Sequence, residues 1–232
     1  MSHPQLVAYF ADHFLAGDRF PTIVEARRMA AAVLNQPVEA GTAIAKLVDE
    51  SVEAGVVRAA RSIIRASTTT YQAYDQLVDL LNRQPSLNVR SSTSVLQQAY
   101  STPIPIAYLA SVLADVTPTT TVYEPTAGNG ALLISANPEL VVANEINGDR
   151  LQELIRQGYT QVTQRDAIDY RPENQVDRVI CNPPFGSIRG ADQRPQRFRM
   201  EDTWTTQIDQ VIALKALTVM KDDGRAVLIL GG

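Results

Sequence analysis

The sequence predicts an α/β fold, in which a region of helices precedes a parallel sheet. Up to about residue 100, apolar residues recur at helical spacing. Beyond it, short β-branched and apolar runs alternate with helical patterns, at 120–123, 140–143, 159–163 and 176–181. Strands that recur between helices indicate βαβ units and therefore a parallel sheet. We accordingly expect a helical domain over 1–97 and an α/β domain over 98–232.

Four helices are expected in the first domain. Each has a recognisable end, at Gly17, before Pro37, near Ala66 and near Pro85. Gly55 weakens the third helix by about 1 kcal/mol relative to alanine. This domain is expected to pack as a bundle on the next domain or on a partner. The alternative, a DNA-reading role, has no particular residues in its support.

Composition and charge exclude several classes of protein. The 232 residues are 45% hydrophobic and 20% charged, with a net charge of −4, so neither half has the basic excess of a self-sufficient nucleic-acid binder. A single cysteine fits a reducing compartment. The two histidines, His3 and His13, have no ligand partners nearby, and we expect no metal site. Without a long apolar run or a signal peptide, the expected location is the cytoplasm.

The most informative stretch is Val179–Gly186, an apolar strand that ends in Asn182, Pro183, Pro184 and Phe185. Proline rings fix the backbone and keep the residue before them extended. The result is a rigid elbow at a strand end, which suits a flat ring that carries an amino group. The amine can donate to the Asn182 oxygen and the Pro183 carbonyl while the ring stacks on Phe185. Cys181 is expected to pack in the core.

A small-residue loop follows the first expected strand. It runs Glu124-Pro-Thr126-Ala127-Gly128-Asn-Gly130 and is expected to lead into a helix through 132–134. Glycines let the backbone approach a ligand closely, and a helix N-terminus is electropositive. Glu145 lies 21 residues after Glu124, at the tip of the second strand, where an acid can accept hydrogen bonds from ribose hydroxyls.

These motifs carry a resemblance over about 98–232. The elbow resembles the Asn/Asp/Ser-Pro-Pro-Tyr/Phe/Trp motif of amino-methyltransferases that use S-adenosylmethionine (SAM). Tyr100-x-Thr102-Pro103 and the Glu-Pro-x-x-Gly-x-Gly loop resemble two further elements of the DNA adenine methyltransferase family. The resemblance implies a Rossmann-like sheet, truncated here after the fifth strand, and SAM as cofactor. The cofactor contacts expected are Tyr100, Thr102, Pro103, Glu124, Thr126, Ala127, Gly128, Gly130, Glu145, Ile146, Asp166, Ala167 and Asn182.

Within this set, Asp166 ends the third strand and is expected to accept a bond from the cofactor's adenine amino group. Asp169 takes its place if the register slips. The implied reaction is direct methyl transfer to the N6 amino group of adenine in DNA, with Asn182, Pro183, Pro184 and Phe185 as catalytic residues. The alternatives are transfer to RNA or to protein glutamine, and a SAM-binding or inactive module with an assembly role.

Arg189, Arg194, Arg197 and Arg199 follow the elbow, against the single acid Asp192. They are expected to form a solvated loop, a phosphate-binding surface for DNA, or both. Trp204 is expected to begin a helix that runs through 208–220, and the fifth strand is expected at 226–230.

DNA is the expected partner, read with the help of a recognition region outside this sequence. The family's sheet continues past the fifth strand. We therefore expect either that this sequence is part of a longer polypeptide or that another element covers the exposed edge strand of the sheet. The layout resembles the front part of large phage or plasmid polypeptides that join a methylase to a helicase-like region.

Overall fold

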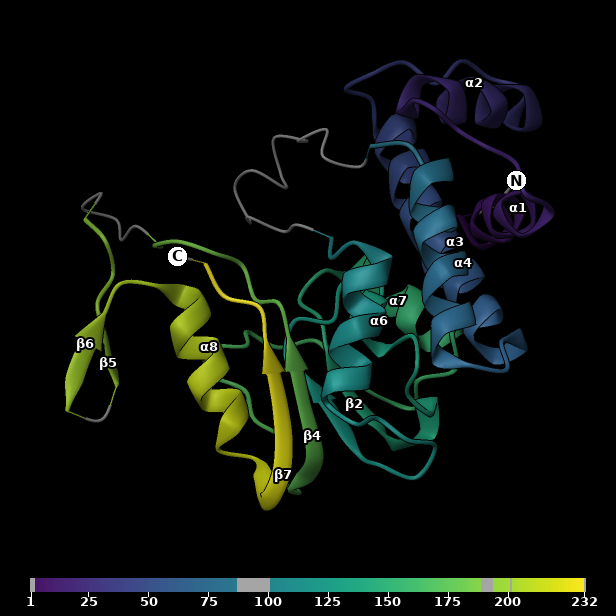
Figure 1. The fold of residues 1–232 in the computed structure, drawn as a ribbon. Helices are drawn as coiled ribbons and strands as arrows, with labels where there is room; N and C mark the ends of the chain where they lie inside the picture. The colour runs from purple at the N-terminus through teal and green to yellow at the C-terminus, as the bar shows by residue number, and fades with distance from the viewer. Residues whose placement is uncertain (1–2, 87–100, 189–193, 201, 232) are drawn as a thin grey trace. The chain divides into compact units, whose positions relative to one another are not determined.

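The computed structural model describes residues 3–86, 101–188, 194–200 and 202–231 (Figure 1). These residues form two compact units. The first contains 3–86 and 103–109, and the second contains 101–102, 110–188, 194–200 and 202–231. The expected boundary between the domains, at residues 97 and 98, lies outside the described residues. No described helix is long and apolar enough to cross a membrane.

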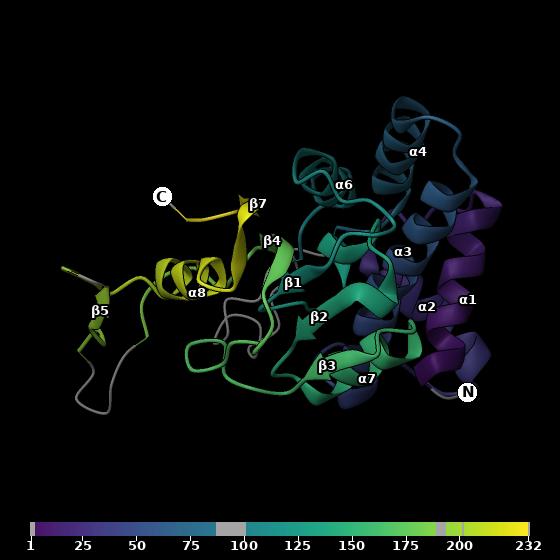
Figure 2. The same ribbon diagram turned by 90° about the horizontal axis from the view of Figure 1, so that it is seen from below.

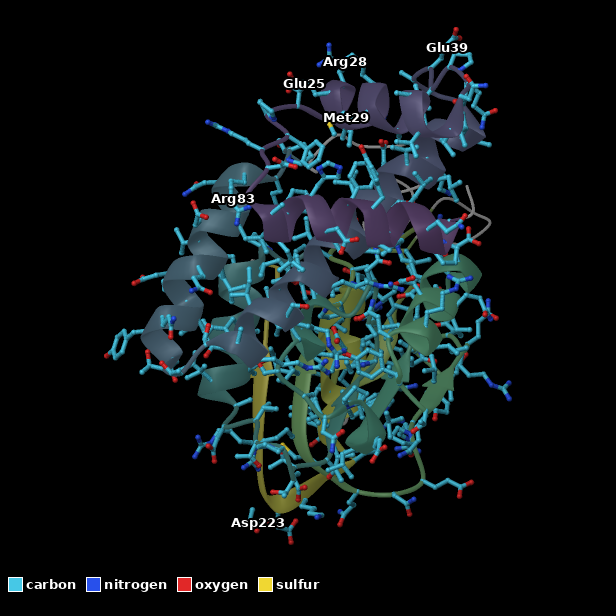
Figure 3. The ribbon with its side chains drawn as sticks, turned by 90° about the vertical axis from the view of Figure 1, so that its right-hand side faces the viewer. Glu25, Arg28, Met29, Glu39, Arg83 and Asp223 are labelled. Carbon is cyan, nitrogen blue, oxygen red and sulfur yellow. The ribbon has the colours of Figure 1, made fainter. Side chains whose placement is uncertain are left out.

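The first unit contains four helices at the predicted places: α1 (His3–Ala16), α2 (Ile23–Leu34), α3 (Ala43–Ala66) and α4 (Thr70–Arg83). Threonine hydroxyls cap three of them, because Thr22, Thr42 and Thr69 accept from the backbone N–H three residues on. Arg83, labelled in Figure 3, donates to the Phe14 carbonyl and so joins the end of α4 to α1. Arg28 and Glu39, labelled in the same view, project away from the helices.

Gly55 has a role in packing that its helix propensity does not reveal. A Cβ atom placed on it would lie 2.8 Å from the Phe10 Cβ and 3.2 Å from the Val7 carbonyl oxygen. Helices α1 and α3 therefore cross at a point where only glycine fits. Phe10 and Phe14 also meet Phe20 edge to face, with ring centroids 5.6 and 5.1 Å apart, respectively.

The second unit is built on a five-stranded sheet in which every pairing is parallel (Figure 2). Its strands are β1 (Val122–Glu124), β2 (Val141–Asn144), β3 (Gln161–Thr163), β4 (Val176–Cys181) and β7 (Met220–Leu228). They lie in the order β3-β2-β1-β4-β7. The chain thus builds outward from β1 in one direction and then returns to build from its other side. This is the doubly wound, Rossmann-like arrangement, and the α/β prediction is confirmed.

Helix α6 (Ile104–Leu113) precedes the first strand, β1. The connections between strands include α7 (Gly148–Arg156), α8 (Ile208–Leu217) and two 3₁₀ turns, η1 (Ala131–Leu133) and η2 (Pro138–Leu140). The α-helix expected after the glycine loop is wrong, because only the turn η1 forms there. The loop therefore gains no helix dipole from the turn that follows it. Ala216 of α8 packs with Val219 on Tyr123, Val176 and Val179.

Two sequence expectations near the C-terminus also need correction. Trp204 does not begin a helix. It lies in β6 (Thr203–Thr205), which pairs antiparallel with β5 (Phe198–Met200), and α8 begins only at Ile208. Aromatic and β-branched residues favour a strand at this point. The fifth strand, β7, begins earlier and ends earlier than expected, and its register with β4 shifts near its start, close to Asp223 (Figure 3).

Candidate functional site

The two motifs that carry the chemistry leave the sheet side by side. Strands β1 and β4 are parallel neighbours, with Val122 opposite Arg178 and Tyr123 opposite Val179. The glycine loop begins after β1 ends, and the elbow begins after β4 ends. Between these two strands the order of the sheet reverses, and ligands of doubly wound sheets bind in the crevice outside the strand ends at such a point. The loop and the elbow therefore flank the position where this fold binds ligands.

Hydrogen bonds to the tip of β2 fix the shape of the glycine loop. Ala127 N–H donates to the Asn144 carbonyl at 2.9 Å, and Gly128 N–H donates to Glu145 Oε2 at 2.7 Å. Gly128 and Gly130 have φ angles of +55° and +85°, which side chains disfavour. A Cβ on Gly130 would also lie 3.1 Å from Leu154. Glycine is thus required at the turn for its backbone conformation.

Glu145 connects two segments of the site. One carboxylate oxygen accepts from Gly128, and the other accepts from Asn147 N–H at 2.7 Å. Each oxygen retains a second lone pair with which it can accept a hydrogen bond from a hydroxyl group. Ile146, the next residue, is 58% exposed and offers apolar surface at the same strand tip.

Glu124 is a buried carboxyl group at the end of β1. Its burial, and secondarily the nearby charge of Glu145, raise its pKa well above the ordinary value. The pKa of the buried Cys181 thiol at the end of β4 is raised by burial and by Glu124. Cys181 is fully buried, as expected of a core residue. Strands β2, β1 and β4 are neighbours in the sheet, so their ends lie side by side.

Asn144 is a residue whose role sequence reasoning missed. Its Nδ2 donates to the carbonyls of Pro125 and Arg165, each at 2.9 Å, and its Oδ1 accepts from Thr163 Oγ1 and Arg165 N–H. This buried amide therefore ties the glycine loop to the tips of β2 and β3. The signal available in the sequence was only its position directly before Glu145.

The tip of β3 carries the two residues expected near the cofactor adenine. Asp166 is exposed, and its Oδ1 accepts from Ile168 N–H at 2.9 Å, while Ala167 is buried. Asp169, the alternative, is also exposed. Asp166 is thus anchored at the strand tip and accessible, although its contact with a cofactor stays a prediction.

The elbow presents Asn182 in a defined orientation. Asn182 Nδ2 donates to Thr102 Oγ1 at 2.9 Å, which leaves Oδ1 as the group's acceptor. Pro183 is buried, and Pro184 and Phe185 are half-buried. The Phe185 ring lies against the segment after β7, since a Cβ on Gly231 would be 3.3 Å from Phe185 Cδ1.

Three buried oxygens in these segments have no hydrogen-bond partner among the described residues: Glu124 Oε2, Thr126 Oγ1 and Asn182 Oδ1. Leaving a buried polar atom unpaired costs on the order of 1–3 kcal/mol. Three such atoms beside one switch point suit a ligand site, because a bound molecule would supply the missing partners. A bound ligand must also displace the atoms that now shield these oxygens from solvent.

The remaining expected site residues stand as follows. Tyr100 and Arg189 lie outside the described residues. The Pro103 carbonyl accepts from Ala107 N–H in the first turn of α6. Arg199 lies in β5 of the β5–β6 hairpin, and Arg197 lies in the segment just before it. In the part of the chain that is described, no three His, Cys, Asp or Glu side chains gather as ligands for a metal ion.

No family model matches the sequence, and a comparison with curated proteins found no match. Among solved structures, the chain is similar to a proposed RNA methyltransferase of Pyrococcus horikoshii, with 26% identity over 63% of this chain and 67% of that one and a TM-score of 0.43. It is similar to TrmN of Thermus thermophilus, with 21% identity over 63% of this chain and 43% of that one and a TM-score of 0.41.

A third similar structure is a proposed class I SAM-dependent methyltransferase of Listeria monocytogenes. The identity is 12%, over 96% of this chain and 70% of that one, with a TM-score of 0.42. The chain thus spans less than half the length of TrmN and about two thirds of the Pyrococcus protein. The assignment of the fold rests on the chain's own strand order.

Proposed function

We propose that this chain transfers a methyl group from SAM to the exocyclic N6 amino group of adenine in DNA. The observation that carries the proposal is Asn182 Oδ1. This acceptor is buried and unpaired, is oriented by Thr102, and follows the strand beside the one that leads into the glycine loop. An acceptor of this kind suits an amino hydrogen of a flat base.

The residues at the carboxyl ends of the strands fit SAM. Glu145 would accept hydrogen bonds from the ribose hydroxyls, and the adenine would lie between Ile146 and Asp166. Glu124, whose Oε2 lacks a partner among the described residues, would accept a hydrogen bond from the positively charged end of the molecule. Gly128 and Gly130 leave the loop backbone open to close approach. SAM, when bound, supplies a methyl group on a positively charged sulfur.

The elbow's contribution to the reaction would be orientation. Adenine N6 is a weak nucleophile, because its lone pair is delocalised into the ring. Hydrogen bonds from its two hydrogens to Asn182 Oδ1 and the Pro183 carbonyl would draw the nitrogen towards a tetrahedral shape. Phe185 would hold the ring in line with the methyl group, and such alignment lowers a barrier by several kcal/mol. Asn182 is no base, so the proton passes to water afterwards.

The target base has to leave the helix stack to reach this elbow, as in other enzymes that act on a base. DNA is proposed over RNA on the resemblance of the loop and the Thr-Pro element. We propose further that selection of a target sequence requires a recognition region outside this chain. That region would belong to the same polypeptide or to a partner.

The direct test offers tritiated SAM to the full chain with DNA, RNA and protein in separate reactions. DNA that gains label is digested to nucleosides, and the label is expected in N6-methyldeoxyadenosine. Label only in RNA or only in protein would contradict the DNA assignment and leave the amino-methyl chemistry standing. Stabilisation by SAM with no transfer to any acceptor would instead establish a cofactor-binding module without enzymatic activity.

A further inference from the structure

The β5–β6 hairpin lies between the elbow and α8, and it has two different faces. Arg199 pairs opposite Trp204 across the strands, so these two side chains lie on the same face. Arg197, two residues before Arg199, follows the same alternation. Phe198 and Met200 point to the other face and are half-buried, whereas Arg199 is exposed and Trp204 is 56% exposed. The polar-aromatic face therefore looks to solvent.

On that face Arg197 and Trp204 form a cation–π pair. The Arg197 guanidinium carbon lies 5.3 Å from the centroid of the Trp204 ring, a cation–π distance. An indole side chain more than half exposed on a two-stranded hairpin contributes little to a core. Its apolar area is held at the surface, with a cation beside it.

Backbone hydrogen bonds fix this hairpin near the proposed catalytic elbow. Gln196 N–H donates to the Ile188 carbonyl at 2.7 Å, and Ile208 N–H donates to the Gly186 carbonyl at 2.9 Å. At the other end, Thr205 Oγ1 contacts Gln210 Oε1 of α8 at 2.6 Å. The segments on both sides of the hairpin are thus hydrogen-bonded to residues 186 and 188, within three residues of Phe185.

We propose that this face binds a nucleic-acid strand, with an unstacked base lying on Trp204 and the neighbouring phosphates beside Arg197 and Arg199. The inference rests on the proposed function and names a substrate contact that the catalytic elbow itself does not provide. Residues 194–205 carry three arginines and two acids, Glu201 and Asp202, in a chain whose net charge is −4. This segment is therefore locally positive in an acidic protein.

The combination of groups favours nucleic acid over an acidic peptide. Arginine alone would attract either polyanion, but an exposed indole adds binding energy only where a flat ring can stack on it. Such stacking tolerates any base, so the surface is expected to hold a strand without choosing its sequence. DNA and RNA share this chemistry, and the experiment distinguishes them.

Trp204 is the only tryptophan in the chain, so its fluorescence reports on this surface directly. The full chain is titrated with a short single-stranded DNA, with an RNA of the same sequence, with an abasic strand of the same length, and with polyglutamate as an acidic peptide. Quenching is expected with the strands that carry bases, and much less at saturation with the abasic strand. Stronger quenching by DNA than by RNA at equal concentration would identify DNA as the preferred strand.

Binding of a fluorescein-labelled strand to variants supplies the second measurement. Trp204→Ala is expected to weaken binding about tenfold or more, whereas Trp204→Phe retains most of the affinity because a ring remains. Arg197→Gln should reduce the salt dependence of binding by about one phosphate contact. Matched controls are Tyr71→Ala, which removes an 86% exposed ring from α4, and Arg28→Gln on α2.

The proposal is overturned if Trp204→Ala binds as the unaltered chain does, or if the abasic strand or polyglutamate quenches as strongly as the base-bearing strands. These outcomes are separate from the fate of the proposed function. Methyl transfer to DNA with an unchanged KM in Trp204→Ala would refute the proposed binding surface and leave the proposed methyltransferase activity standing. Base-dependent quenching with no methyl transfer to any acceptor would do the reverse.

Discussion

At the scale of single residues, the site depends on which atom Asn182 presents. An amide side chain offers either its oxygen or its two N–H groups to a neighbour, and an unanchored one turns freely between them. The hydroxyl of Thr102 accepts from Nδ2, which leaves the oxygen facing away as an unpaired acceptor. Thr102, expected to contact the cofactor, thus also supports the elbow.

Replacing Asn182 tests the elbow itself. Asn182→Ala removes the proposed acceptor for the amino group, and the rate of methyl transfer is expected to fall at least about a hundredfold, as when one transition-state hydrogen bond is lost. Equilibrium binding of SAM, measured by calorimetry, should change little, because the loop and the tip of β2 are intact. Undiminished transfer by this variant would rule out the role assigned to Asn182.

Thr102 is expected to act through Asn182. Thr102→Val keeps the shape of the side chain and removes the hydroxyl, so the amide loses one orienting hydrogen bond, and kcat should fall about three- to tenfold. Thr102→Ser retains the hydroxyl and is expected to retain the rate. If both variants lower kcat equally, or if only the KM for SAM rises, Thr102 holds the cofactor without positioning Asn182.

At the scale of elements, Asp177 clamps the starts of three neighbouring strands. Its Oδ2 accepts from the N–H and hydroxyl of Thr121, just before β1, and its Oδ1 accepts from Lys221 Nζ of β7 at 2.7 Å. The Lys221 contact, followed by the Thr121 backbone bond, lowers the pKa of Asp177 to about 2. This cluster lies at the opposite end of the strands from the candidate site.

Because the folded pKa of Asp177 is lowered, its charge stabilises the fold above the ordinary aspartate pKa of about 3.9. That contribution is lost as the pH falls from about 4 towards 2. Asp177→Asn should therefore be less stable than the unaltered chain at pH 6 and approach it at pH 2.5. Urea unfolding at both pH values, followed by Trp204 fluorescence, measures this difference. Asp223→Asn, an exposed carboxylate of β7, serves as control. An equal deficit at both pH values would contradict the assignment.

At the scale of the whole molecule, the sequence revealed the sheet and most helices because strand runs, helical spacing and glycine or proline stops are local signals. It also predicted candidate site residues, since the motifs follow consecutive strands, and the role of each of these residues stays a prediction. It missed contacts that depend on tertiary structure. The sequence predicts Gly55 only as a residue that weakens a helix, whereas in the structure Phe10 packs directly against it. Trp204 reads as helical because α8 follows closely, but its pairing with Arg199 makes it part of a hairpin.

The division of the chain into two units leads to a final prediction. The described residues expected to hold SAM lie in the second unit, except Pro103, and Trp204 lies in that unit as well. A ligand that binds only the folded state stabilises it by about 2.7 kcal/mol at a concentration of 100 times its Kd. SAM should therefore raise the melting temperature reported by Trp204 fluorescence, and Glu145→Ala should remove most of that rise. Glu139→Ala, an exposed acid on η2, is the matched control and should keep the full rise. An absent shift in the unaltered chain at millimolar SAM would refute cofactor binding at this sheet edge.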